Sequence, residues 1–128
     1  MKYNESREMY LETIYLLERE AQHAHTADIA KLLGVSKPSV TKAMGLLKEQ
    51  GLIEQERYGP VILTAQGREV SEKIYENHKL ITQFIISSLE LSPKQAEEDA
   101  CKIEHIISQQ MLSAMKAYLD TETRHVKK

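Results

Sequence analysis

The stretch TADIAKLLGVSKPSVTKAMGLLKEQG, residues 26–51, predicts how the N-terminal half of this chain folds. Its first part keeps apolar residues at helical spacing, with Thr26 as the expected cap and Gly34 as the expected end. In its second part Ser36 is expected to cap a helix, and Pro38 lies in the first turn, where its missing N–H is not needed. Two short helices joined by such a turn predict a helix-turn-helix.

The residues on either side extend this motif. After Gly51 the pattern changes, because residues 52–64, LIEQERYGPVILT, alternate like two short strands around a turn at Tyr58-Gly59-Pro60. Before the motif, residues 6–21 have the spacing of an amphipathic helix, with Ser6 as its expected cap. A helix, a helix pair and a hairpin in this order predict a winged helix-turn-helix.

The second half of the chain is helical throughout. Long helical patterns cover residues 65–89, 93–107 and 109–119, and Ser92 and Pro93 form a typical helix start. We therefore expect a mainly α fold in three parts, namely a winged helix-turn-helix domain at residues 1–64, an all-helical domain at 65–120 and a polar tail at 121–128.

The composition excludes several classes of protein. With 128 residues and 41% hydrophobic residues, the chain can form one ordinary domain or two small ones. It contains no apolar run of about 18 residues, as a membrane span requires, and its N-terminus lacks the apolar core of a secretory signal. A single cysteine excludes an internal disulfide and fits a reducing cytoplasm, which is the expected location.

The second helix of the pair is the candidate recognition helix. The net charge of −2 argues weakly against nucleic acid, but residues 31–48 carry four lysines and no acidic residue. Short hydroxyl and amine side chains suit phosphates and base edges in a major groove, and the hairpin tip would be a wing on the DNA backbone. The alternative is a small helical core with a solvated basic face. The candidate DNA-binding residues are Thr26, Ser36, Lys37, Pro38, Ser39, Thr41, Lys42, Arg57 and Tyr58.

The only cysteine, Cys101, lies in the stretch ACKIEH, residues 100–105. In a continuous helix the carboxylates and the imidazole nearby would lie within about 60° of Cys101, opposite the apolar residues, which disfavours a packing role. Thiolate, carboxylate and imidazole at positions i, i+3 and i+4 can converge on one metal ion, and a solvated charged face is equally compatible. A cysteine nucleophile with His105 as base is less favoured, because no oxyanion-hole loop can be recognised.

Four stretches together resemble the diphtheria toxin repressor family of metal-activated, dimeric transcriptional repressors. They are EMYLETIYLLE at 8–18, VSKPSVTKAMGLLKEQGLI at 35–53, LTAQGREV at 63–70 and EEDACKIEHIIS at 97–108. The combination of EMY with CxxEH is specific. The resemblance implies that the helical second domain forms a homodimer, that the partner is a palindromic operator in double-stranded DNA, and that metal acts as corepressor of iron or manganese uptake genes.

The resemblance also assigns metal ligands. Glu12 matches a carboxylate that manganese-responsive members use, and the principal site of the family maps to Met9, Cys101, Glu104 and His105. A second family site includes a histidine that maps to His78. Two ligands of that site in iron-responsive members are replaced here by Thr82 and Glu97, so a second site would be built differently, from His78, Glu97 and Glu98.

The identity of the metal follows from the ligand types. Sulfur atoms from Met9 and Cys101 favour Fe²⁺ over the harder Mn²⁺. The chain ends at residue 128, as in the shorter manganese-responsive members, whereas many iron-responsive members add an SH3-like domain. We expect Fe²⁺, with Mn²⁺ as the alternative. A winged-helix regulator that senses a small organic ligand is a rival interpretation.

Overall fold

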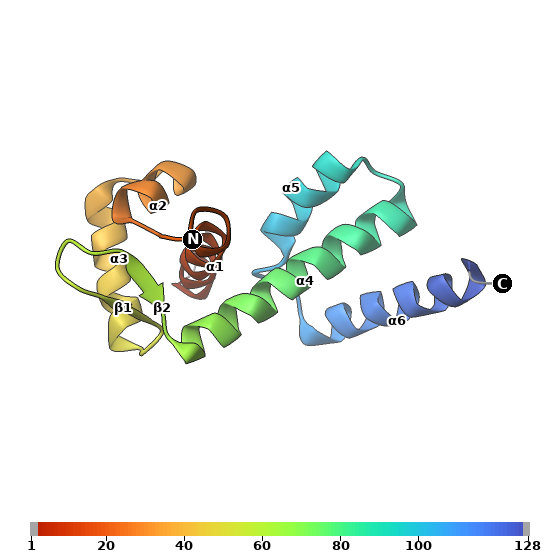
Figure 1. Cartoon of the computed structure of the whole chain (residues 1–128). Coiled ribbons are helices and arrows are strands. Elements are labelled where there is room, and N and C mark those ends of the chain that lie inside the picture. Colours follow the sequence, from red (N-terminus) through yellow and green to blue (C-terminus); the bar gives the residue numbers. More distant parts are fainter. Residues whose placement is uncertain (1–2, 127–128) are drawn as a thin grey trace. The chain divides into compact units, whose positions relative to one another are not determined.

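The computed structural model describes residues 3–126, and their side chains from residue 6 to residue 122. These residues form, in order, α1 (Tyr3–Ala21), α2 (Thr26–Leu33), α3 (Lys37–Glu49), β1 (Ile53–Gln55), β2 (Val61–Leu63), α4 (Ala65–Leu89), α5 (Pro93–Ile103) and α6 (Gln109–Val126) (Figure 1). The chain divides into two compact units within α4, between Lys73 and Ile74. None of the helices among residues 3–126 combines the length and the apolar character that crossing a membrane requires.

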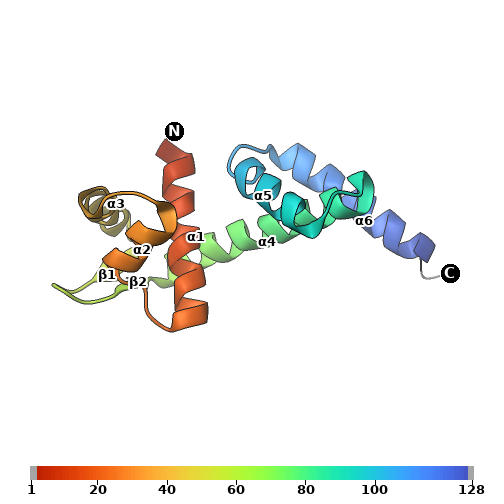
Figure 2. The same ribbon diagram turned by 90° about the horizontal axis from the view of Figure 1, so that it is seen from above.

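The first unit is the predicted winged helix-turn-helix. Figures 1 and 2 show α1, α2 and α3 gathered beside the hairpin of β1 and β2. The strands are antiparallel, with Ile53 opposite Leu63, and the N–H of Val61 donates to the carbonyl of Ala24 at 2.7 Å. The helices α1, α2 and α3 and both strands contribute to the core of this unit. Its largest fully buried hydrophobic residues are Leu11, Ile14, Ile29, Val40, Ile53 and Val61.

Two of the predicted ends in the helix-turn-helix are confirmed. Gly34 ends α2 in the left-handed conformation, with φ of 66°, which glycine adopts without steric cost. Ser36 is the N-cap of α3, and its hydroxyl oxygen accepts a hydrogen bond from the N–H of Ser39 at 3.2 Å. Pro38 lies in the first turn of α3 as expected. The turn between the helices was therefore readable from its residue types.

Two predicted caps are wrong. The first helix begins at Tyr3, so Ser6 lies inside α1. The N-cap position of α2 is His25, which makes no side-chain cap, and Thr26 is already helical. The hydroxyl of Thr26 instead accepts a hydrogen bond from Gln55 in β1, so a tertiary contact replaces the expected local one.

The second unit packs the later part of α4 against α5 and α6, which flank it in Figure 1. Its buried core consists of Ile81, Ile85, Ala96, Ala100, Leu112 and Met115. Ser92 caps α5 as predicted, accepting from the N–H of Gln95 at 3.1 Å. The last helix continues past the predicted end at Leu119 to Val126.

The end of α5 also differs from the prediction. The helix stops at Ile103 rather than 107, and Glu104 occupies its C-cap position. Ile103 at the helix end and Ile107 beyond the turn pack against the core, whereas Ile106 is 68% exposed. Glu104 still has helical backbone angles, with φ of −58° and ψ of −25°, and its carboxylate lies within 4.8 Å of the Sγ atom of Cys101.

Candidate nucleic-acid interface and metal centre

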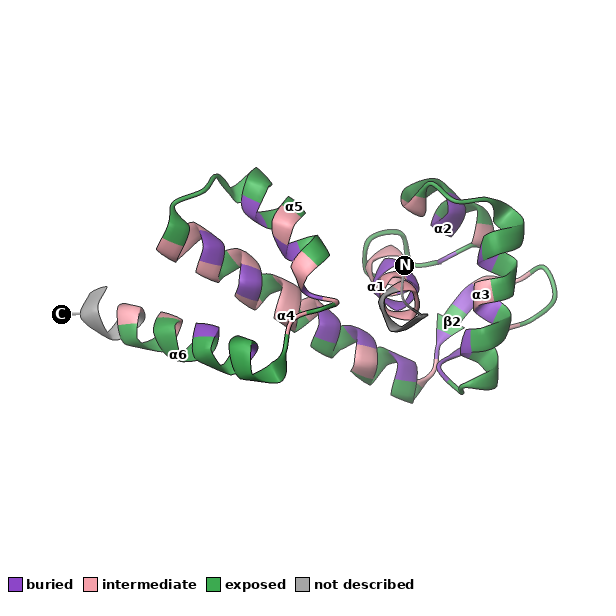
Figure 3. Cartoon of the chain, turned by 180° about the vertical axis from the view of Figure 1, so that it is seen from behind, coloured by how far each residue is buried: buried purple, intermediate pink, exposed green. Residues whose placement is uncertain are grey.

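The predicted recognition helix presents its candidate DNA-binding residues to solvent. Val40, Met44 and Leu47 are buried, and α3 has no acidic residue in its first turn. Figure 3 shows exposed residues along most of this helix. The exposed set near its N-terminus is Ser36, Lys37, Pro38, Ser39, Thr41 and Lys42. Positive charge and hydroxyl groups at a helix N-terminus suit an anionic backbone such as that of DNA.

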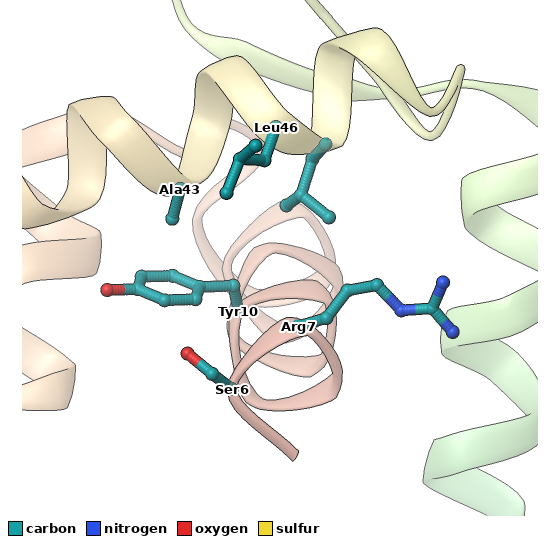
Figure 4. A pocket seen from close by; sticks show the side chains of 6 residues that line it. Ser6, Arg7, Tyr10, Ala43 and Leu46 are labelled. Carbon is teal, nitrogen blue, oxygen red and sulfur yellow. The ribbon is translucent and has the colours of Figure 1, made fainter. Parts of the chain in front are cut away.

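Leu46, on the same helix, is 39% exposed. It lines a small, mostly apolar pocket between α1 and α3 with Ser6, Arg7, Tyr10, Ala43 and Leu47 (Figure 4). Tyr10 and Ala43 face each other across this pocket. The pocket therefore lies where the first helix packs against α3.

The wing tip combines a cation and an aromatic ring. Its turn is closed by a hydrogen bond of 2.9 Å from the N–H of Gly59 to the carbonyl of Glu56. Tyr58 is 92% exposed and has φ of 64°, and the guanidinium carbon of Arg57 lies 5.4 Å from the centre of its ring. A left-handed tyrosine costs about 1–2 kcal/mol, and burial does not offset this cost here. Such strain is typical of functional positions.

A buried carboxylate is the centre of the candidate metal site in the second unit. The side chain of Glu104 is 0% exposed and lies between two histidines. Its Oε2 is 3.1 Å from Nδ1 of His78 on α4, and its Oε1 is 3.4 Å from Nε2 of His105. Nε2 of His78 lies 3.6 Å from Oε1 of Glu97 on α5. The Sγ atom of Cys101 lies within 4.8 Å of a Glu104 carboxylate oxygen, so the structure brings together five of the predicted ligands.

The chemistry of this cluster fits a divalent cation. Burying a carboxylate is unfavourable unless its charge is compensated. Among the described residues, Oε1 of Glu104 makes no hydrogen bond, although the imidazole of His105 is close to it. Carboxylate oxygen and imidazole nitrogen are ligands of Mn²⁺, Fe²⁺ and Zn²⁺. A metal ion would supply the missing positive charge.

The residues of this cluster come from both of the metal sites that the family resemblance assigned. His78 was assigned to a second site and Glu104 to the principal one, yet they form a direct contact between residues 26 positions apart. No local pattern signals this contact. Cys101 is exposed in the last turn of α5, as its helical position predicted, and Glu98 is exposed on the same helix.

The remaining predicted ligands lie in the first unit. Met9 and Glu12 are one turn apart on α1, so their side chains leave the same face of that helix. The hydroxyl of Thr13 donates to the carbonyl of Met9 at 2.8 Å. Their participation in metal binding stays a prediction.

Two family models match this chain along nearly its whole length. Residues 2–61 match the iron dependent repressor N-terminal DNA binding domain, and residues 64–126 match the iron dependent repressor metal binding and dimerisation domain. The two matches meet close to the domain boundary that was predicted between residues 64 and 65. The exact position of this boundary stays a prediction.

Individual relatives agree with these models. An uncharacterised HTH-type transcriptional regulator of Methanocaldococcus jannaschii is 36% identical over 91% of this chain and 94% of its own length. The transcriptional regulator MntR of Escherichia coli is 37% identical over 85% of this chain and 70% of its own length. A manganese-dependent transcriptional repressor in complex with manganese superimposes with a TM-score of 0.82 at 26% identity, over 89% of this chain and 52% of that one. The chain spans about half the length of this structure and of two further solved structures that it matches, the manganese regulator SloR and IdeR of T. acidophilum.

Proposed function

Because this chain belongs to the iron-dependent repressor family, we propose that it is a metal-activated transcriptional repressor whose corepressor is Fe²⁺, with Mn²⁺ as the alternative. The family consists of DNA-binding regulators rather than enzymes, so a catalytic role of Cys101 is not supported. The observation that carries the proposal is the buried carboxylate of Glu104 between His78 and His105.

The proposed ligand set joins this cluster to residues that the sequence resemblance supplies, namely Met9, Glu12 and Cys101. Glu97 and Glu98 are proposed as additional carboxylates near His78. When bound, the metal compensates the charge of Glu104. The sulfur atoms of Met9 and Cys101 support Fe²⁺, whereas the manganese-dependent relatives support Mn²⁺.

Metal would act by selecting a conformation. The apo-protein samples several arrangements, and the metal-bound form is the one that fits operator DNA. Linkage then requires that DNA tighten metal binding by the same factor. A homodimer would present two copies of α3 about 34 Å apart to successive major grooves of a palindromic operator. We place this activity in the cytoplasm, at genes of iron or manganese uptake.

Cys101→Ala tests the choice of metal. We expect this variant to lose at least about 10-fold in affinity for Fe²⁺ and less in affinity for Mn²⁺, because a thiolate favours the softer ion. Anaerobic titration of each ion into wild type and variant measures both affinities. Lys102→Ala, at the next exposed position of α5, is the matched control and should bind both ions like wild type. Equal losses for the two ions would remove the argument for Fe²⁺.

The same titration addresses the rival regulator of a small organic ligand. A wild-type protein that binds no divalent metal more tightly than an unrelated acidic protein does would support that rival. DNA binding that rises with Fe²⁺ or Mn²⁺ would exclude it.

Lys42→Ala tests the DNA-binding surface. A lysine that neutralises one phosphate contributes about one unit to the slope of log affinity against log salt concentration. We therefore expect weaker binding to all DNA sequences and a slope shallower by about one unit. Fluorescence anisotropy of DNA with metal-loaded protein at several salt concentrations measures this slope, with Lys116→Ala on α6 as control. An unchanged slope would remove Lys42 from the interface.

A further inference from the structure

Gln55, the last residue of β1, contacts three other elements of the first unit. Its side-chain Nε2 donates to the carbonyl of Gly59 at 3.0 Å and to the hydroxyl of Thr26 at 3.4 Å. Its backbone carbonyl accepts from Nζ of Lys48, near the end of α3, at 3.5 Å. The side chain is half-buried, and neither of its partners is a neighbour in the strand. The residue therefore connects the wing turn, the start of α2 and α3.

The chemistry of the partners determines how this amide is oriented. The carbonyl of Gly59 can only accept, so the NH₂ end of the side chain faces it. An amide nitrogen carries two hydrogens, and the two contacts use both. Gly59 also closes the turn through its N–H to Glu56. The turn that carries Arg57 and Tyr58 is thus bonded at Gly59 through both its N–H and its carbonyl.

The contact with Thr26 has a second consequence. The Thr26 hydroxyl uses an oxygen lone pair to accept from Gln55, and its own hydrogen can still donate. A hydroxyl donor at the first residue of α2 suits a phosphate oxygen. The side chain of Gln55 therefore orders both the Thr26 hydroxyl and the wing turn, which were predicted to bind DNA.

We propose that Gln55 is a positioning residue for DNA binding, which holds the wing turn and the Thr26 hydroxyl in one arrangement without contacting DNA itself. The inference rests on the proposed function as a DNA-binding repressor. An exposed hairpin tip without this tether samples more conformations, and binding must then order it. Groups ordered before binding avoid that loss of affinity.

Gln55→Met tests the inference, because it keeps the length of the side chain and removes both donors. We expect operator affinity to fall by about 10-fold, with metal affinity and the thermal midpoint of the apo-protein close to wild type. The probe is a DNA duplex that the metal-loaded wild type selects from a random-sequence pool. Gln55→Glu is the second variant, since a carboxylate also cannot donate to Gly59 and has nearly the same shape. Gln110→Glu, exposed on α6, controls for its added charge.

A double-mutant cycle separates positioning from direct contact. The Gln55→Met change is repeated in a background that carries Thr26→Val, Arg57→Ala and Tyr58→Ala. If Gln55 acts through these groups, its substitution should cost less than about 2-fold in that background. An undiminished 10-fold cost, or a full cost explained by a lowered thermal midpoint, would overturn the inference. A wild type that selects no duplex with either metal would instead refute the proposed function.

Discussion

Replacing Glu104 with glutamine is expected to weaken the binding of Fe²⁺ and Mn²⁺ by at least about 100-fold. Loss of a residue that only supports a metal ligand lowers metal affinity by up to about 100-fold, and loss of a ligand itself should cost at least as much. The carboxylate is fully buried between His78 and His105, so its charge is the natural attraction for a cation in this cluster. Glutamine keeps the shape and can still bond to His78, but it removes the negative charge. The folded apo-protein should therefore persist while metal binding is lost.

The measurement is a competition titration against a chelator, under anaerobic and reducing conditions. Glu90→Gln, an exposed position after α4, is the matched control, because it makes the same chemical change outside the cluster. We expect the control to bind metal like wild type. Metal affinity that stays within about 3-fold of wild type in Glu104→Gln would place the metal elsewhere, since a lost ligand has a much larger effect. Metal-dependent DNA binding should be lost together with metal affinity, because the two are linked.

Gly67→Ala is expected to destabilise the first unit by about 3 kcal/mol. Gly67 lies in the first turns of α4, where a Cβ atom would come within 1.9 Å of the carbonyl oxygen of Leu52 and 2.9 Å of its carbonyl carbon. These are backbone atoms, so no side chain can move aside. The same carbonyl of Leu52 accepts from the N–H of Thr64 at 3.1 Å, and a shift would break this bond at the start of α4.

Gly45→Ala is the matched control with the opposite expected sign. Gly45 lies inside α3, and nothing is within 4 Å of a Cβ atom there. Alanine is favoured over glycine in a helix by about 0.5–1 kcal/mol, so this variant should be more stable than wild type. Thermal or urea unfolding of both variants measures the pair. Equal stabilities would show that Leu52 can move away from α4, and that the close approach is not rigid.

The local architecture of this protein could be predicted from its amino-acid sequence. Apolar spacing placed the helices, Gly34, Ser36 and Ser92 marked ends that the structure confirms, and alternation with Tyr58-Gly59-Pro60 placed the hairpin. These features depend on residues within one or two turns of each other, whose backbone preferences act before the chain folds. The same local patterns, together with the family resemblance, were enough to indicate a metal-dependent DNA-binding regulator.

The end of α5 and the surroundings of Glu104 could not be predicted from local sequence patterns. A continuous helix to 107 predicted Glu104 beside Cys101 on a solvent face. In the structure the Glu104 carboxylate does lie within 4.8 Å of the Cys101 Sγ atom, but α5 ends at Ile103 and the carboxylate is fully buried between His78 and His105. Likewise, Thr26 was predicted to cap α2, but its hydroxyl accepts a hydrogen bond from Gln55, 29 residues away. A prediction from helical periodicity assumes that the helix continues. Contacts between residues that are distant in the sequence do not alter the local spacing of apolar residues, so the sequence pattern does not reveal them. Both outcomes depend on contacts between residues that are far apart in the sequence.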